Sequence, residues 1–151
     1  MDFNLRVSRT LNVGLIIEVL TDEQIFDATN EDGAQHTDLK IDVINEFWVS
    51  MFADDELVGV ANFKGKTKNM YDCHINILPE QRKHSLAAGD ALLGWCGDNL
   101  KDCLLTTTVP ACCDNVTRFL LKFGFSQNGK LEKAWLKDGK QHDMNILTRI
   151  A

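Results

Sequence analysis

Apolar and polar residues alternate along several short stretches of the chain, the pattern of half-buried β-strands. This alternation predicts strands over residues 3–7, 47–52, 57–63, 70–78, 103–109, 131–136 and 144–150. Short polar turns separate the second strand from the third and the sixth from the seventh, and the latter turn contains Asp138-Gly139. Both pairs are therefore predicted to form antiparallel hairpins.

Apolar residues at helical spacing predict helices between these strands. Thr10 is expected to cap a helix that extends to about Leu20, and Thr21 with Gln24 resembles a capping box that opens a further helical turn. A later helix is predicted over about 85–100, with five residues on one face: Leu86, Gly89, Leu93, Cys96 and Leu100.

Another helix is predicted from Asp114 to about Phe123, where Gly124 ends it. The stretch 30–37 has the composition of a loop, and 39–44 fits a short helix or an extended piece equally well. The order of elements predicts a mixed α/β fold, a sheet with helices on its faces.

Length and composition fit one globular domain over residues 1–151, since 44% of the residues are hydrophobic and 25% charged. No apolar run is long enough for a membrane span or a secretion signal, so a cytoplasmic location is expected. The five cysteines are odd in number and form no CxxC pair, which favours buried thiols in a reducing compartment and no metal site.

Charge is distributed unevenly along the chain, which carries a net −6. From Glu18 to Glu56 there are twelve acidic residues and a single basic one, Lys40, whereas the rest has ten acidic and fifteen basic residues. The net charge argues against nucleic acid as a partner. The acidic stretch is either a solvated helical surface or the side that receives a cationic acceptor.

Residues 75–93 predict a strand, a basic turn and a helix in direct succession. Backbone N–H groups are unpaired at the start of a helix, and the helix dipole is positive there. With Arg82 and Lys83 beside it, this turn is predicted to bind an anion such as phosphate.

The same turn resembles the acetyl-CoA loop of the GNAT superfamily of N-acetyltransferases, Arg/Gln-x-x-Gly-x-Gly/Ala after a Pro-Glu pair. Here Pro79-Glu80 precede Arg82-Lys-His-Ser-Leu-Ala87, and Ser85 stands at the first glycine. The resemblance implies a mostly antiparallel central sheet with helices on both faces, and acetyl-CoA as co-substrate. It also implies that the main chain at Ile77 and Leu78 aligns the pantetheine and thioester. The backbone amides that would hold the pyrophosphate are those of Arg82, Lys83, His84, Ser85, Leu86 and Ala87.

Two further segments resemble the family, 108–125 with its closing Gly-Phe and 129–143 with its hairpin. In the first, Cys113 stands where the family often has an asparagine at the coenzyme site. Leu120, beside Phe119, stands where it commonly has the tyrosine that protonates the leaving thiolate. The likeness is greatest to the small phage-encoded members, which would place the protein in a host cytoplasm.

The predicted strand 70–78 carries the candidate catalytic residues. Asp72, His74 and Asn76 alternate onto one face, and such a polar stripe on a central strand is costly unless it lines a cleft or is hydrogen-bonded. His74 is the candidate general base, oriented by Asp72, and the other reading is a structural histidine in a polar network.

Other candidate side chains have weaker claims to a role. His84 is expected to contact an anion or to be solvated, and His36 and His142 to lie on the surface. Cys112 or Cys113 could act as a nucleophile only beside a base.

The resemblance implies direct transfer of an acetyl group from acetyl-CoA to a primary amine, on a protein or on a small cationic molecule. The alternative is a catalytically inactive protein of the same fold that serves in phage binding or virion assembly, which the departures at Ser85, Cys113 and Leu120 favour. A homodimer is compatible with either function.

Overall fold

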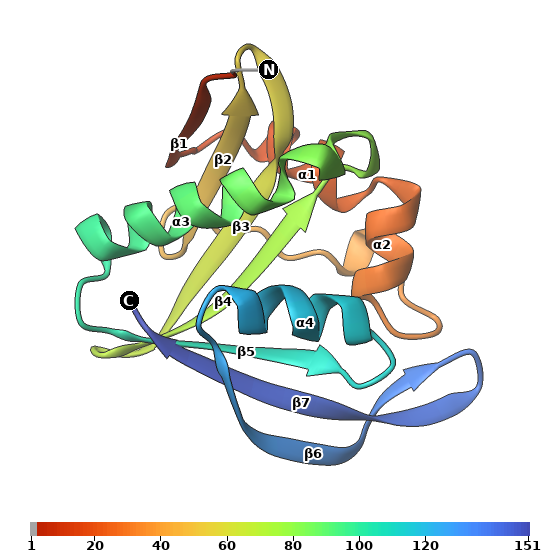
Figure 1. Ribbon diagram of the computed structural model, residues 1–151. Helices are drawn as coiled ribbons and strands as arrows, with labels where there is room; N and C mark the ends of the chain where they lie inside the picture. Colours follow the sequence, from red (N-terminus) through yellow and green to blue (C-terminus); the bar gives the residue numbers. More distant parts are fainter. Residues whose placement is uncertain (1–2) are drawn as a thin grey trace.

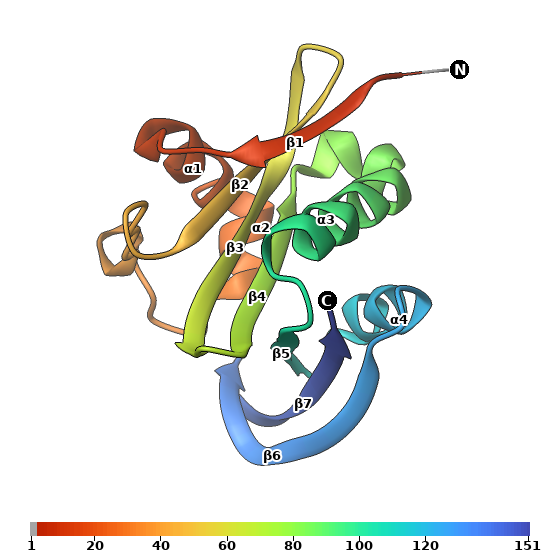
Figure 2. The ribbon, with the colours of Figure 1, turned by 90° about the vertical axis from the view of Figure 1, so that its left-hand side faces the viewer.

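The computed structural model describes residues 3–151 and shows a twisted seven-stranded sheet with helices on both faces (Figures 1 and 2). The sheet order is β1-β2-β3-β4-β5-β7-β6. The strands are β1 Leu5–Arg9, β2 Phe47–Ala53, β3 Glu56–Thr67, β4 Met70–Ile77, β5 Leu104–Pro110, β6 Ser126–Lys137 and β7 Lys140–Ile150. The helices are α1 Val13–Leu20, α2 Glu23–Thr29, α3 Ser85–Asn99 and α4 Asp114–Lys122, with 3-10 turns η1 His36–Asp38 and η2 Pro79–His84.

The predicted mixed, mostly antiparallel sheet is confirmed. Five of the six strand pairs are antiparallel, and β4 with β5 is the parallel one. Both predicted hairpins are present, and the turn between β6 and β7 has positive φ at Asp138 (53°) and Gly139 (74°). This is the geometry of a type I′ turn, which Asp-Gly adopts readily.

The two faces of the sheet have separate apolar cores. α3 and α4 cover one face, and the buried cluster there includes Val49, Ala61, Leu92, Leu105 and Leu147. α1 and α2 lie over the other face, on a smaller cluster of six buried residues: Ile16, Val19, Ile25, Trp48, Val60 and Leu78. Successive side chains of a strand point to opposite faces of the sheet, so neighbouring residues of β2 and β3 contribute to different cores.

The first two helices begin later than their predicted caps. Asn12, rather than Thr10, caps α1, because its side-chain oxygen accepts from Leu15 N–H at 3.1 Å. Asp22 caps α2 in the same way, and the Thr21 hydroxyl instead donates to the carbonyl oxygen of Ile17 at 2.7 Å. In both places a longer Asx side chain nearer the helix takes the capping role.

The start of α3 and the preceding loops also differ in detail from the prediction. Leu86 is 56% exposed, because the buried stripe of α3 runs through Ala88, Leu92 and Cys96. A helix turns about 100° per residue, so Leu86 lies on the opposite side from Ala88. Residues 39–44 form no helix, whereas a 3-10 turn at His36–Asp38 lies partly inside the predicted loop.

Candidate functional site

β4 and β5 separate soon after they begin, which leaves one edge of β4 without a strand partner. Their parallel pairing covers only Met70–Asp72 against Leu104–Thr106. Beyond that point Leu78 N–H donates to Val58 of β3 at 2.8 Å. Backbone groups alternate sides along an antiparallel strand, so those of Ile75 and Ile77 point away from β3 into the opening. The opening thus presents a row of N–H and C=O groups to a ligand.

Two helices begin at the open end of this gap. α3 follows β4 through η2, and α4 follows β5, so both N-termini lie beyond the carboxyl ends of the diverging strands (Figure 1). Arg82 and Lys83 are exposed at the start of α3, whose first turn contains no acidic residue. Among residues 3–151, no ion pair occupies either side chain, so both charges are available to an anion.

Ser85 does not need the backbone freedom of the glycine it replaces. Its φ of −57° and ψ of −44° are ordinary helical values. A glycine at this position would therefore serve only the close approach of a ligand, which the Cβ of Ser85 limits. The Ser85 hydroxyl donates its hydrogen to the Arg82 carbonyl at 2.8 Å, so this hydrogen is already used within the turn.

His84 is not solvated, contrary to one sequence expectation. Its side chain is buried, with the ring packed edge-on against Phe3 at 4.3 Å between centroids. Its Nδ1 atom has no hydrogen-bond partner among the described residues. Any contact of His84 with an anion would therefore be made by its main chain.

The polar stripe of β4 lies on the other face of the sheet, on the side of α1 and α2. Asn76 pairs with Val60, which belongs to the core beneath α1 and α2, so the alternating residues Asp72 and His74 share that face. His74 Nε2 lies 3.4 Å from Asp72 Oδ2, and the two side chains are 47% and 27% exposed. His74 lies two residues beyond Asp72, the last residue of β4 that pairs with β5, so it stands beside the gap, open to solvent.

α4 contains no tyrosine that could reach the gap. Leu120 is buried in the core, and the chain's one tyrosine, Tyr71, packs on the same apolar face beside Phe47. Cys113 occupies the N-cap position of α4 without a capping hydrogen bond. Burial and the neighbouring Cys112 thiol raise the pKa of Cys113, which lowers its thiolate fraction and argues against a nucleophilic role.

The cysteines are free thiols with unequal burial. Cys96 is buried, and burial raises its pKa to about 12. Cys73, Cys103 and Cys113 are partly buried, whereas Cys112 is exposed, contrary to the expectation of buried thiols. Within residues 3–151, no group of three or more His, Cys, Asp or Glu side chains is arranged to hold a metal ion.

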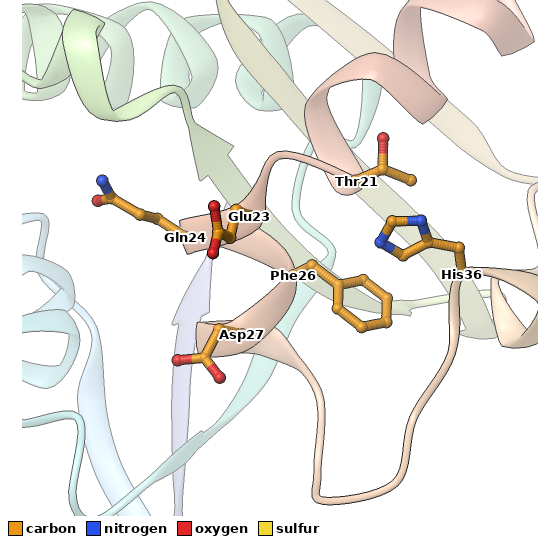
Figure 3. A pocket seen from close by; sticks show the side chains of 6 residues that line it. All are labelled: Thr21, Glu23, Gln24, Phe26, Asp27 and His36. Carbon is orange, nitrogen blue, oxygen red and sulfur yellow. The ribbon is translucent and has the colours of Figure 1, made fainter.

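Two surface hollows lie away from the strand gap, along the outer side of α1 and α2. Figure 3 shows one of about 610 Å³, lined by Thr21, Glu23, Gln24, Phe26, Asp27 and His36. The other, of about 440 Å³, is lined by Val13, Ile17, Thr21, His36, Leu39 and Ile41. Neither contains a residue predicted to bind the coenzyme. The acidic run from residue 18 was the sequence signal for this surface, although no single residue marked it.

Comparison with known proteins gives a likeness in structure only. No protein-family model and no curated protein matches the sequence. Spermidine N-acetyltransferase from Vibrio cholerae, solved with CoA and spermine, superimposes with a TM-score of 0.81 at 14% identity, over 97% of this chain and 95% of the other. The chain has the GNAT fold.

Two further GNAT structures extend the likeness to nearly the whole of each chain. Ribosomal-protein-alanine N-acetyltransferase from Brucella melitensis has a TM-score of 0.72 at 12% identity, over 97% of this chain and 99% of the other. A GNAT-family acetyltransferase from Streptococcus pneumoniae has a TM-score of 0.69 at 14% identity, with the same coverage. No helix among residues 3–151 is long and apolar enough to cross a membrane.

Proposed function

We propose that the protein is an acetyl-CoA-dependent N-acetyltransferase that acts on a primary amine by direct attack. The observation that carries this proposal is the gap between β4 and β5, where free backbone groups of β4 meet the N-terminus of α3. A pantetheine chain needs hydrogen-bonding partners of this extended kind, and a diphosphate needs an electropositive turn. The Vibrio enzyme of the same fold was solved with CoA, which supports this use of the gap.

In this proposal, the chain holds acetyl-CoA by backbone groups on both sides of η2. The amides of residues 82–84, 86 and 87, together with the side chains of Arg82 and Lys83, bind the pyrophosphate. The Ser85 N–H already donates to the Arg82 carbonyl within the turn. The main chain at Ile77 aligns the pantetheine so that the thioester lies in the gap. Leu78, for which the resemblance implied the same role, instead fixes the end of β4, because its N–H donates to Val58 and its C=O accepts from Gln81. Cys113, at the start of α4, borders the open end.

His74 is the proposed general base, and Asp72 is the residue that orients it. A neutral imidazole accepts a proton from the incoming ammonium, and the Asp72 carboxylate, 3.4 Å from Nε2, holds the ring in position. The amine then attacks the thioester carbonyl, the C–N bond forms, the C–S bond breaks, and the nitrogen loses its second proton to water. Because Leu120 replaces the usual acid, the CoA thiolate leaves without a side-chain proton donor and is protonated by water.

A mass-spectrometric assay tests this proposal. Purified protein and acetyl-CoA are incubated with spermidine in one reaction and with a lysine-containing peptide in another. The acetylated amine and the free CoA are quantified in both reactions. Mass detection is preferable to a thiol reagent because Cys112 is exposed. The proposal expects both products in equal amounts, and it fails if neither forms although acetyl-CoA binds.

The second candidate is a binding protein that has lost catalysis. The specific observation in its favour is the buried Leu120 at the usual position of the acid. Coenzyme binding without turnover, for every amine offered, would support this candidate. A role in a phage particle belongs to the same candidate.

A further inference from the structure

The two hollows beside α1 and α2 form one continuous groove, because Thr21 and His36 line both of them. We call it the α1–α2 groove. Its two ends differ in chemistry: Val13, Ile17, Leu39 and Ile41 line one, and Glu23, Gln24, Phe26 and Asp27 line the other. The α1 residues of the groove, Val13 and Ile17, lie roughly a third of a turn around the helix from the buried Ile16 and Val19.

The apolar end consists of side chains that the fold leaves uncovered. Val13 and Ile17, one helical turn apart on the same face of α1, are 39% and 42% exposed. Leu39 and Ile41 are only partly buried. Apolar side chains gathered in a concave surface are typical of a binding surface for another apolar group.

The acidic end consists of carboxylates on one face of α2. Glu23 and Asp27 are one helical turn apart, and both are exposed. Lys137 Nζ lies 3.1 Å from Asp27 Oδ1, whereas Glu23 takes part in no ion pair of residues 3–151. Lys137 thus offsets the charge of Asp27, and Glu23 is the carboxylate at this end that is free to pair with a cationic side chain of a ligand.

An aromatic pair separates the two ends. Phe26 of α2 and His36 of η1 stack edge-to-face with centroids 4.6 Å apart. Figure 3 shows the two rings next to each other. Such a wall can pack against the aliphatic stem of a lysine or arginine whose charged group reaches the carboxylates. The groove therefore has the apolar end, the Phe26–His36 pair and the acidic end in succession.

We propose that the α1–α2 groove binds a basic amphipathic polypeptide segment, with its apolar side chains over Val13 and Ile17 and a lysine or arginine beside Glu23. A free polyamine would use the acidic end and leave the apolar end unused. A second copy of this chain, docked by the same surface about a two-fold axis through its centre, would place the acidic end of each copy against the apolar end of the other and leave the carboxylates without a cationic partner. This inference concerns binding alone and holds whether or not the protein transfers acetyl groups.

Fluorescence anisotropy with a labelled peptide tests the proposal directly. The probe is a peptide with leucine and lysine at amphipathic helical spacing, and its two comparison peptides replace leucine by serine or lysine by glutamate. We expect each comparison peptide to bind at least about tenfold more weakly, since each loses one of the two complementary ends. Spermidine should displace the probe only partly, even at millimolar concentration.

Matched variants locate the site on the protein. Ile17→Ser should weaken probe binding about tenfold, and Glu23→Gln about threefold with a smaller salt dependence. The controls are Leu121→Ser, an apolar residue on α4 that is 48% exposed, and Glu132→Gln, an exposed acid on β6. Both controls should bind the probe as the unmodified protein does, and unchanged thermal midpoints establish that every variant is folded.

Four results would overturn the proposal. They are equal binding of the serine or glutamate peptide, full displacement by spermidine, no loss of affinity in Ile17→Ser, and no binding of the leucine–lysine probe. Sedimentation analysis gives a fifth: a dimer of the free protein that Ile17→Ser dissociates would assign the groove to a second copy of the chain.

Discussion

The two faces of the sheet differ in how closely they are packed, and the difference separates two roles. On the α3/α4 face, an added Cβ at Gly89 would collide with the ring of Phe123, the residue that ends α4, so the two helices meet without spare room. On the α1/α2 face, the core is smaller, and Asp72 and His74 remain partly exposed beside it. The α3/α4 face, which we call the packed face, fixes the shape of the strand gap. The α1/α2 face, which we call the open face, leaves room for the amine of the proposed reaction to approach the gap.

The largest expected effect concerns the open face. His74→Ala should reduce kcat by about 10²-fold to 10³-fold, because general-base catalysis is worth about that much. Binding of acetyl-CoA should not change, since the imidazole lies on the opposite face of β4 from α3 and α4. Product formation and calorimetric coenzyme affinity are measured on the same preparation.

His142→Ala is the control for this prediction, because His142 is a partly buried histidine near the tip of the β6–β7 hairpin. An unchanged kcat in His74→Ala would remove His74 as the base. A loss of coenzyme affinity equal to the loss of rate would show that the two faces are not separate in function.

The second prediction concerns the packed face. Gly89→Ala should lower the free energy of unfolding by about 1–3 kcal/mol, because the new methyl group collides with the Phe123 ring. Gly94→Ala, on the same helix with open space at its Cβ position, should raise stability by about 0.5–1 kcal/mol. Urea unfolding measures both, and equal changes in the two variants would contradict close packing at Gly89.

The third prediction concerns the turn at the mouth of the gap. Ser85→Gly should strengthen acetyl-CoA binding several-fold, because removing the Cβ permits a closer approach and the backbone angles need no glycine. Ser85→Ala keeps a Cβ and serves as the control, since it removes only the hydroxyl bond to Arg82. Weaker binding in Ser85→Gly than in Ser85→Ala would show that the Cβ is not an obstacle.

The smallest effect concerns the hairpin tip, which anchors to the chain after α2. The backbone N–H groups of Gly139 and Asp138 donate to Asp32 and lower the pKa of its carboxyl group from 3.8. Because the pKa of Asp32 is lower in the folded state than in the unfolded state, its ionised carboxylate stabilises the folded state at pH values above the unfolded-state pKa. This stabilisation is lost as the pH falls through the folded-state pKa. The amide shifts of Asp138 and Gly139 should therefore titrate below pH 3.8, and no such titration should occur in Asp32→Ala.

The sequence predicted the sheet well, because the alternation of apolar and polar residues and the Asp-Gly turn each depend on only a few neighbouring residues. They predicted the caps less well, since Asn12 and Asp22 compete with nearby threonines and geometry decides between them. The burial of His84 could not be predicted, because Phe3 lies 81 positions away in the chain and only the tertiary fold brings the rings together.

The candidate site was predicted in the same uneven way. The contact between Asp72 and His74 follows from strand periodicity alone. The contacts of Lys137 with Asp27 and Asn30 join residues more than a hundred positions apart, so no pattern in the chain indicated them. The α1–α2 groove likewise combines two helices and a loop, of which only the acidic composition was visible beforehand.

The most direct test of the central claim is a thermal unfolding measurement with acetyl-CoA, on the unmodified protein and on Arg82→Ala. If the gap between β4 and β5 holds the coenzyme, a concentration of about 100 times Kd adds about 2.7 kcal/mol. For a chain of this size that raises Tm by roughly 5–10 °C. Arg82→Ala should show a smaller rise at the same concentration, because one phosphate contact is lost. An unchanged Tm at millimolar acetyl-CoA in the unmodified protein would contradict the account.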